Sequence, residues 1–133
     1  MSKLKPYNGG QWTKSRFHSF VAGALRSVTS RWGPIAQAKK NARVRRGFYL
    51  CNACKQEIPA TLPAVYKSGK KKGKPYRRKN ALVDHIRPIV DPVKGFQSWD
   101  EFISNLFCEL DNLQVLCHEC HQKKCQEERQ ARK

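Results

Sequence analysis

The chain has 133 residues, of which 39% are hydrophobic, and its 27 Lys and Arg exceed its 10 Asp and Glu, giving a formal net charge of +17. This length predicts one domain, and its core should be thin because globular chains are typically about 45–50% apolar. The absence of an apolar run of roughly 18 residues and of a secretory signal excludes a membrane-spanning or secreted protein and predicts a cytoplasmic location.

The positive charge is concentrated in the first 80 residues, which hold 20 Lys and Arg and one acidic residue, Glu57. Residues 81–133 hold 7 basic and 9 acidic residues. Charge that serves only solubility usually mixes both signs, whereas segregated positive charge indicates a polyanionic partner. A membrane surface would require a basic amphipathic helix with bulky apolar residues, so we expect nucleic acid.

Two helices are predicted near the N-terminus. Apolar residues at helical spacing predict the first over 13–31, and Pro34 suits the first turn of a second over 35–46, which Gly47 ends. Together they form a basic arm, residues 1–46. The Lys-rich segment 67–79 has no apolar periodicity and is predicted to be a mobile loop that either contacts the nucleic-acid backbone or is merely solvated. The candidate DNA-binding residues are Arg16, Lys39, Lys40, Arg43, Arg45, Arg46, Lys70, Lys71, Lys72, Arg77 and Arg78.

A second part of the chain, in which short strands and helices are mixed, is predicted over residues 47–133. Strands are expected over 48–50, 62–66, 81–86 and 110–117. Ser98 is a plausible N-cap for a short helix through Phe107, with Glu101 at the capping-box position. A final helix is expected to begin near His118, with Glu119 close to its positive end.

Four of the six cysteines form two CxxC pairs, Cys51–Cys54 and Cys117–Cys120. Each pair lets two sulfurs of one tight turn reach the same ion, and two pairs complete a tetrahedral zinc site. Because 62 residues separate Cys54 from Cys117, a structural Zn²⁺ here would join distant parts of a thin-cored chain.

Alternatives for the cysteines also follow from the sequence. His118 or His121 could replace one sulfur of the zinc site, whereas a redox CxxC would need a thioredoxin-like context that is absent. Cys108 and Cys125 have no CxxC partner. Each is expected to be a small buried or half-buried side chain, although Cys125 could be an exposed thiol.

Polar residues gather around the second CxxC. Asp84 and His85 end a predicted strand, Asn112 opens the next one, and His121 lies in the first turn of the last helix. Any one of them alone would more often be structural. Their joint occurrence beside a zinc site and a basic arm favours a functional site.

Two stretches then resemble the HNH endonuclease signature, in which the first His, the Asn and the last His give the family its name. They are Asp84-His-Ile-Arg-Pro88 and Asp111-Asn-Leu-Gln-Val-Leu-Cys-His-Glu-Cys-His-Gln-Lys-Lys124. Cys51-Asn-Ala-Cys54 matches the zinc-bearing branch, and the resemblance spans roughly 48–125. It implies an α+β fold containing a ββα-metal motif: a β-hairpin and one helix around a divalent ion. The organisation expected is thus the basic helical arm 1–46, followed by an HNH nuclease domain, 47–133, stapled by a four-cysteine zinc site.

The resemblance also implies roles for the polar residues. His85 would be the general base, because imidazole exchanges a proton near neutral pH, and Asp84 and His121 would hold one Mg²⁺ or Mn²⁺ against the scissile phosphate. The Asn112 amide would bond the backbone of the opposing loop and so fix His85, although a direct metal role is also open. The products would carry a 5′-phosphate and a 3′-hydroxyl.

The expected function is therefore metal-dependent hydrolysis of double-stranded DNA, by nicking or double-strand cleavage. The protein would be a monomer or weak dimer, similar to phage and homing-type nucleases, in a bacterial or phage-infected cell. The main rival is a non-catalytic, zinc-stapled nucleic-acid-binding module, and an RNA-binding zinc ribbon of ribosomal type is a third reading.

Overall fold

The computed structural model describes residues 4–132. Contacts divide the chain into two units, Met1–Trp32 and Gly33–Lys133. Within the described residues there are four α-helices and seven strands, and the strands form three small antiparallel sheets. This confirms the expected mixture of helices and small sheets. Across residues 4–132, every helix is too short or too polar to span a membrane.

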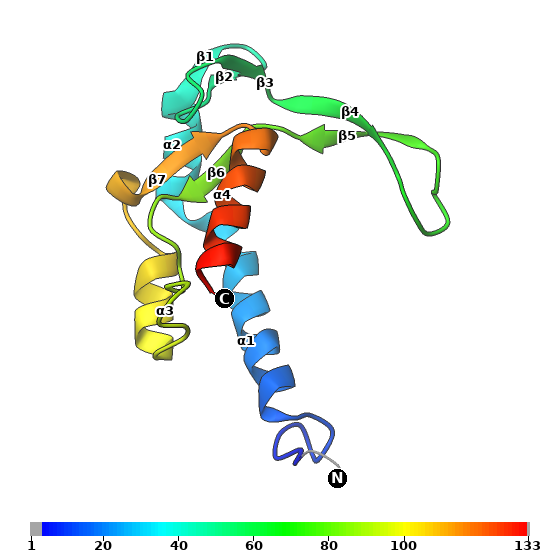
Figure 1. Cartoon of the computed structure of the whole chain (residues 1–133), viewed down its shortest axis with the longest axis vertical. Helices are drawn as coiled ribbons and strands as arrows, with labels where there is room; N and C mark the ends of the chain where they lie inside the picture. Colours follow the sequence, from blue (N-terminus) through cyan, green and yellow to red (C-terminus); the bar gives the residue numbers. More distant parts are fainter. Residues whose placement is uncertain (1–3, 133) are drawn as a thin grey trace. The chain divides into compact units, whose positions relative to one another are not determined.

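The first unit consists of helix α1 (Lys14–Val28) with a loop packed on its first turns (Figure 1). The Thr13 hydroxyl caps the helix by accepting from the Arg16 amide at 3.2 Å. The ring of Tyr7 stacks on Phe17 at 4.2 Å between centroids, and α1 has no buried residue. The helix predicted over 13–31 is confirmed, with its last turn tightened into a 3₁₀-helix over Thr29–Arg31.

The second unit begins with helix α2 (Gly33–Ala42), which packs on strand β7 (Leu113–Leu116) through the buried Ala38. The prediction of helix to residue 46 is wrong at its end, because Arg43–Arg45 form strand β1. This strand pairs with β2 (Phe48–Leu50) across a tight turn, in which Gly47 has φ +80°. The boundary between the units falls before α2, and the division at residue 46 into arm and nuclease domain stays a prediction.

Strand β2 is confirmed as predicted, and it also pairs with an unpredicted strand, β3 (Glu57–Pro59). The turn that holds the first CxxC reverses the chain between them. In this turn the Cys51 amide donates to the Gln56 carbonyl at 3.0 Å, and the Lys55 amide donates to the Cys51 carbonyl at 2.9 Å. The turn geometry therefore creates β3, whose three residues alone carry no strand signal.

A ribbon follows, formed by β4 (Thr61–Val65) and β5 (Pro75–Lys79), which pair from Thr61↔Lys79 to Val65↔Pro75. Figure 1 shows it in green, reaching away from the β6–β7 pair of its own unit. The prediction of a loop is wrong for Pro75–Lys79, because pairing with β4 orders residues that have no apolar periodicity of their own. The Tyr66 and Tyr76 rings stack at 4.5 Å near the tip.

The remaining elements form the centre of the second unit. Strand β6 (Leu82–His85) pairs antiparallel with β7, and helix α4 (His118–Ala131) packs on both strands (Figure 1). These elements agree with the strand predicted around 81–86 and with the last helix. The strand predicted over 110–117 is wrong at its start, because Leu110–Asn112 form a 3₁₀-helix before β7. The core beside them is small and includes two cysteines. Its members are Cys51, Ile58, Ala81, Val115, Leu116 and Cys117.

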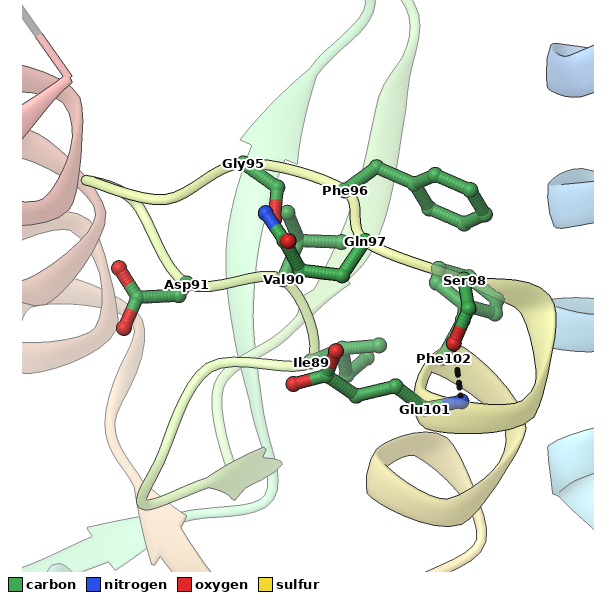
Figure 2. A pocket seen from close by; sticks show the side chains of 9 residues that line it. All are labelled: Ile89, Val90, Asp91, Gly95, Phe96, Gln97, Ser98, Glu101 and Phe102. Atoms are coloured by element: carbon green, nitrogen blue, oxygen red, sulfur yellow. Dashed lines mark hydrogen bonds between the residues drawn. The ribbon is translucent and has the colours of Figure 1, made fainter.

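In the sequence, helix α3 (Trp99–Leu106) lies between β6 and β7. It is capped as predicted by Ser98, whose hydroxyl accepts from the Glu101 amide at 3.2 Å. The loop before it encloses a small cleft, and Figure 2 shows Ile89, Val90 and Gln97 around it while the Asp91 carboxylate points away. Hydrogen bonds from the Lys94 and Val93 amides lower the pKa of Asp91. None of the predicted site residues lines this cleft, so it belongs to the scaffold.

Candidate functional site

The four CxxC cysteines converge on one point. Cys51 and Cys54 lie in the turn after β2, whereas Cys117 caps α4 and Cys120 lies in its first turn. Their sulfur atoms all lie within 4.8 Å of one another. Cys51 is fully buried and Cys117 is 8% exposed. This cluster could hold a metal such as zinc, which prefers four tetrahedral thiolates in closed structural sites.

Backbone amides around the cluster favour negative charge on sulfur. The Cys117 amide donates to the Cys51 sulfur at 3.4 Å, and the Cys120 amide donates to the Cys117 sulfur at 3.4 Å. Burial alone would raise the pKa of Cys51, but backbone amides, including those of Cys54 and Cys117, lower it to about 6. The Cys117 side chain raises the pKa of Cys120 to about 12. The donor set therefore suits a cation that displaces the remaining thiol protons when it binds.

The other candidate ligands lie outside the four-sulfur set. His118 is half-buried, and its backbone amide donates to Asn80. Its pKa is lowered by burial and by the charge of Arg78. Cys108 and Cys125 are half-buried, as expected, and Cys125 lies one turn from His121 with its sulfur 3.8 Å from Nδ1. Within the described residues, the four CxxC sulfurs alone form the cluster.

Asp84 and His121 are brought together where β6 meets α4. The Asp84 Oδ1 and His121 Nε2 atoms are 3.7 Å apart, and the side chains are 12% and 34% exposed. His85, the next residue of β6, makes a separate contact through its ring. Its Nε2 lies 2.8 Å from the Leu106 carbonyl at the end of α3.

The bond to Leu106 fixes which nitrogen of His85 can accept a proton. A carbonyl oxygen can only accept, so Nε2 must carry the hydrogen of this bond. In the neutral ring, Nδ1 then holds the free lone pair. His85 is thus held in the tautomer that a general base acting through Nδ1 requires.

Asn112 is 5% exposed and lies directly before β7. Its side-chain oxygen accepts from the Arg87 amide at 2.9 Å, and its backbone carbonyl accepts from the Ile86 amide at 2.8 Å. The amide therefore makes the expected bonds to the backbone of the opposing loop, immediately after His85. The side-chain oxygen of Asn112 is therefore already hydrogen-bonded to the Arg87 amide.

Lys124 is a site residue that the sequence reasoning missed. Its ammonium lies 2.8 Å from Asp84 Oδ2 and 3.1 Å from Glu128 Oε1, and it also donates to the His85 carbonyl. Burial would lower the pKa of Lys124, but Asp84 and Glu128 outweigh this and raise it. Helical spacing in the sequence could have identified Lys124, because residues 121, 124 and 128 share one face of α4.

Gln114 is a second missed residue. It is paired with Asp84 across the strands, and its amide donates to Asp84 Oδ2 at 3.0 Å. The Asn52 amide donates to Gln114 Oε1 at 2.8 Å, and Lys55 donates to Asn52. A chain of hydrogen bonds thus links the turn of the first CxxC to Asp84. Cross-strand pairing of β6 with β7 was the signal that could have found it.

The candidate DNA-binding residues fall into two groups. Lys39 and Arg78 are half-buried and the other nine are exposed. Lys70, Lys71 and Lys72 occupy the tip of the ribbon, where Lys71 lies 5.7 Å from the Tyr66 ring centroid. Arg45 is paired with Glu57. The tip therefore offers three consecutive exposed lysines.

Comparisons of the chain with protein-family models, with curated proteins and with solved structures found no match. The site is therefore defined by its own residues and their geometry. Those residues comprise a four-cysteine cluster and, linked to it by hydrogen bonds, a carboxylate, an imidazole and an ammonium group.

We predict that the purified chain binds one Zn²⁺ through the four cysteines and that strong chelation unfolds its second unit, because binding energy at a structural zinc site is folding energy. Cys51→Ser should lose the metal and the folded circular-dichroism spectrum, whereas Cys108→Ser, outside the cluster, should keep both. Elemental analysis that finds less than about half a zinc per folded chain would contradict the assignment.

We also predict that Asn112→Ala lowers the free energy of unfolding by about 1–3 kcal/mol, because the Arg87 amide loses its buried partner. Urea unfolding with excess zinc measures this change. Asn105→Ala removes a single bond to the Ile89 carbonyl and should cost less. Equal costs for the two variants would show that Asn112 does not brace the loop after His85.

Proposed function

We propose that the chain is a metal-dependent HNH-type endonuclease that hydrolyses phosphodiester bonds of double-stranded DNA. The observation that carries the proposal is the approach of Asp84 and His121 to 3.7 Å at the junction of β6 and α4. Two antiparallel strands followed by a helix, with these side chains between them, are the parts that a ββα-metal motif requires.

Asp84 and His121 fit a divalent ion of the Mg²⁺ or Mn²⁺ type. A carboxylate with one imidazole leaves coordination positions for water and phosphate, as Mg²⁺ prefers. The side chains of Asp84 and His121 are 12% and 34% exposed, so the pair is partly open to solvent. When bound, the ion would neutralise charge on the phosphate and on the leaving oxygen.

His85 would activate the water. With Nε2 held by Leu106, Nδ1 takes a proton from the water as its oxygen attacks phosphorus. The bond from phosphorus to the 3′ oxygen breaks, and that oxygen takes a proton from solvent. The products then carry a 5′-phosphate and a 3′-hydroxyl. Asn112 would keep His85 in place through its bonds to the following residues.

The basic residues would hold the DNA backbone. Lysines 70–72 are exposed at the ribbon tip, and no acidic residue lies between Glu57 and Asp84 in the sequence. Contacts of lysine and arginine with phosphates position a protein on DNA without reading its sequence. Arg16, Lys40, Arg43 and Arg46 are also exposed and would add further backbone contacts.

A non-catalytic nucleic-acid-binding module is the second candidate function. One observation favours it: Asp84 is already paired with the ammonium of Lys124 at 2.8 Å. A carboxylate that served only structure would be neutralised in this way. The two candidates differ in whether His85 is needed for anything beyond folding and binding.

We predict that His85→Ala lowers the rate of DNA cleavage about 10²–10⁴-fold while zinc content and DNA affinity stay unchanged, because a general base acts only during reaction. Plasmid nicking or linearisation in Mg²⁺ or Mn²⁺ measures the rate. Asp84→Ala and His121→Ala should also inactivate, but more metal should partly restore them. Glu119→Ala, exposed on the same helix, is the control, and cleavage by His85→Ala at the wild-type rate would leave the binding module as the function.

We further predict that replacing Lys70, Lys71 and Lys72 by Gln flattens the salt dependence of DNA binding. Each lost phosphate contact reduces the slope of log K against log salt by about 0.9. Fluorescence anisotropy with duplexes of unrelated sequence should show equal weakening for all of them. Gln at Lys123, Arg129 and Arg132 removes the same charge from α4 and its C-cap and should leave the slope nearly unchanged. Equal slopes for both triple variants would place DNA away from the ribbon.

A further inference from the structure

Lys124 supplies the positive charge of the candidate site. Its side chain is 22% exposed and lies among three oxygens, from Asp84, Glu128 and the His85 backbone. Two of these three acceptors are carboxylates. Asp84 therefore contacts the Lys124 ammonium and is also one of the residues that would hold a divalent ion.

The two oxygens of Asp84 face different groups. Oδ1 faces His121, whereas Oδ2 accepts from Lys124 at 2.8 Å and from Gln114 at 3.0 Å. A divalent ion held by Asp84 and His121 would lie at about 2 Å from its ligand atoms. It would therefore come within a few ångströms of the ammonium, where two cations repel strongly in a partly buried site.

The charged groups around Lys124 carry a net negative charge. Asp84 and Glu128 contribute −2 and Lys124 contributes +1, so the sum is −1 when the histidines are neutral. A divalent ion raises the sum to +1, and one DNA phosphate returns it to zero. Without Lys124 the sum would be −2, and the ion alone would neutralise it.

We propose that Lys124 makes binding of the catalytic ion depend on the DNA phosphate, so that ion and DNA bind cooperatively. This inference rests on the proposed function, because it concerns the ion that Asp84 and His121 would hold. The ammonium weakens ion binding to the free protein, and the phosphate then supplies the missing negative charge. Coupling between two ligands is reciprocal, so the ion would strengthen DNA binding by the same factor.

Glu128 has a defined part in this arrangement. It contacts the same ammonium as Asp84, at 3.1 Å. Glu128 can therefore retain Lys124 when the ion draws Asp84 away. Loss of Glu128 should make ion binding weaker, which is the opposite of the effect expected for loss of Lys124.

The experiment measures the Kd of Mn²⁺ from the electron paramagnetic resonance signal of free Mn²⁺. It uses the zinc-loaded full chain carrying His85→Ala, so that DNA stays intact, with and without a short duplex. Without DNA, Lys124→Met should bind Mn²⁺ about tenfold more tightly than the parent, since a like charge is removed. The duplex should tighten Mn²⁺ binding by the parent at least about tenfold, but by Lys124→Met much less.

Neighbouring residues provide matched controls. Lys123→Met removes the same charge from the exposed adjacent position and should change the DNA-free Kd less than about twofold. Glu128→Gln should weaken Mn²⁺ binding, whereas Glu127→Gln should not. Lys124→Gln tests the same charge loss with a polar side chain, should the Met variant fold poorly.

Two failures can be told apart. If the parent binds Mn²⁺ through Asp84, judged by loss in Asp84→Asn, but Lys124→Met and Lys124→Gln bind it no more tightly than Lys123→Met, the Lys124 proposal is wrong and the nuclease proposal stands. If Asp84→Asn has no effect on Mn²⁺ binding with or without DNA, the proposed ion site itself is wrong, and both proposals fall.

Discussion

The convergence of four sulfur atoms is the constraint on which the second unit depends. Cys51 and Cys117 are separated by 65 residues in the sequence, yet the amide of one donates to the sulfur of the other. Both belong to a core cluster of six buried residues within the described part of the chain. A core this small contributes modest hydrophobic stabilisation, so long-range order rests largely on closing the cluster. The β2–β3 pair and the β7–α4 segment are joined at that point.

The candidate site inherits its geometry from this closure. Asn52, between the first two cysteines, holds Gln114, and Gln114 holds Asp84. On the other side, His121 follows Cys120 directly, so its position is set by the second CxxC. His121 is thus the chain neighbour of Cys120, and Asp84 is two hydrogen bonds away from Asn52, the chain neighbour of Cys51. Opening the cluster would disturb the fold and the site together.

The sequence predicted features that are determined locally and missed those that need a partner. The CxxC turns, the Ser98 cap and helix α4 follow from residues close together in the chain, and each was found. Strands β1, β3 and β5 carry weak signals and are strands because β2 and β4 lie beside them. Likewise Asp84 and His121 could be named from motif resemblance, whereas the contacts of Lys124 and Gln114 with Asp84 require the register of β6 with β7.

The ribbon of β4 and β5 has a consequence for how the protein behaves at high concentration. A two-stranded sheet leaves the outer edge of each strand without a neighbouring strand in the described part of the chain, and such edges invite pairing between molecules. Pro63 and Pro75 lie within these strands and lack the N–H group that an added strand would need. The surrounding lysines and arginines repel a second copy. The positive charge of the ribbon therefore opposes edge-to-edge pairing of two copies.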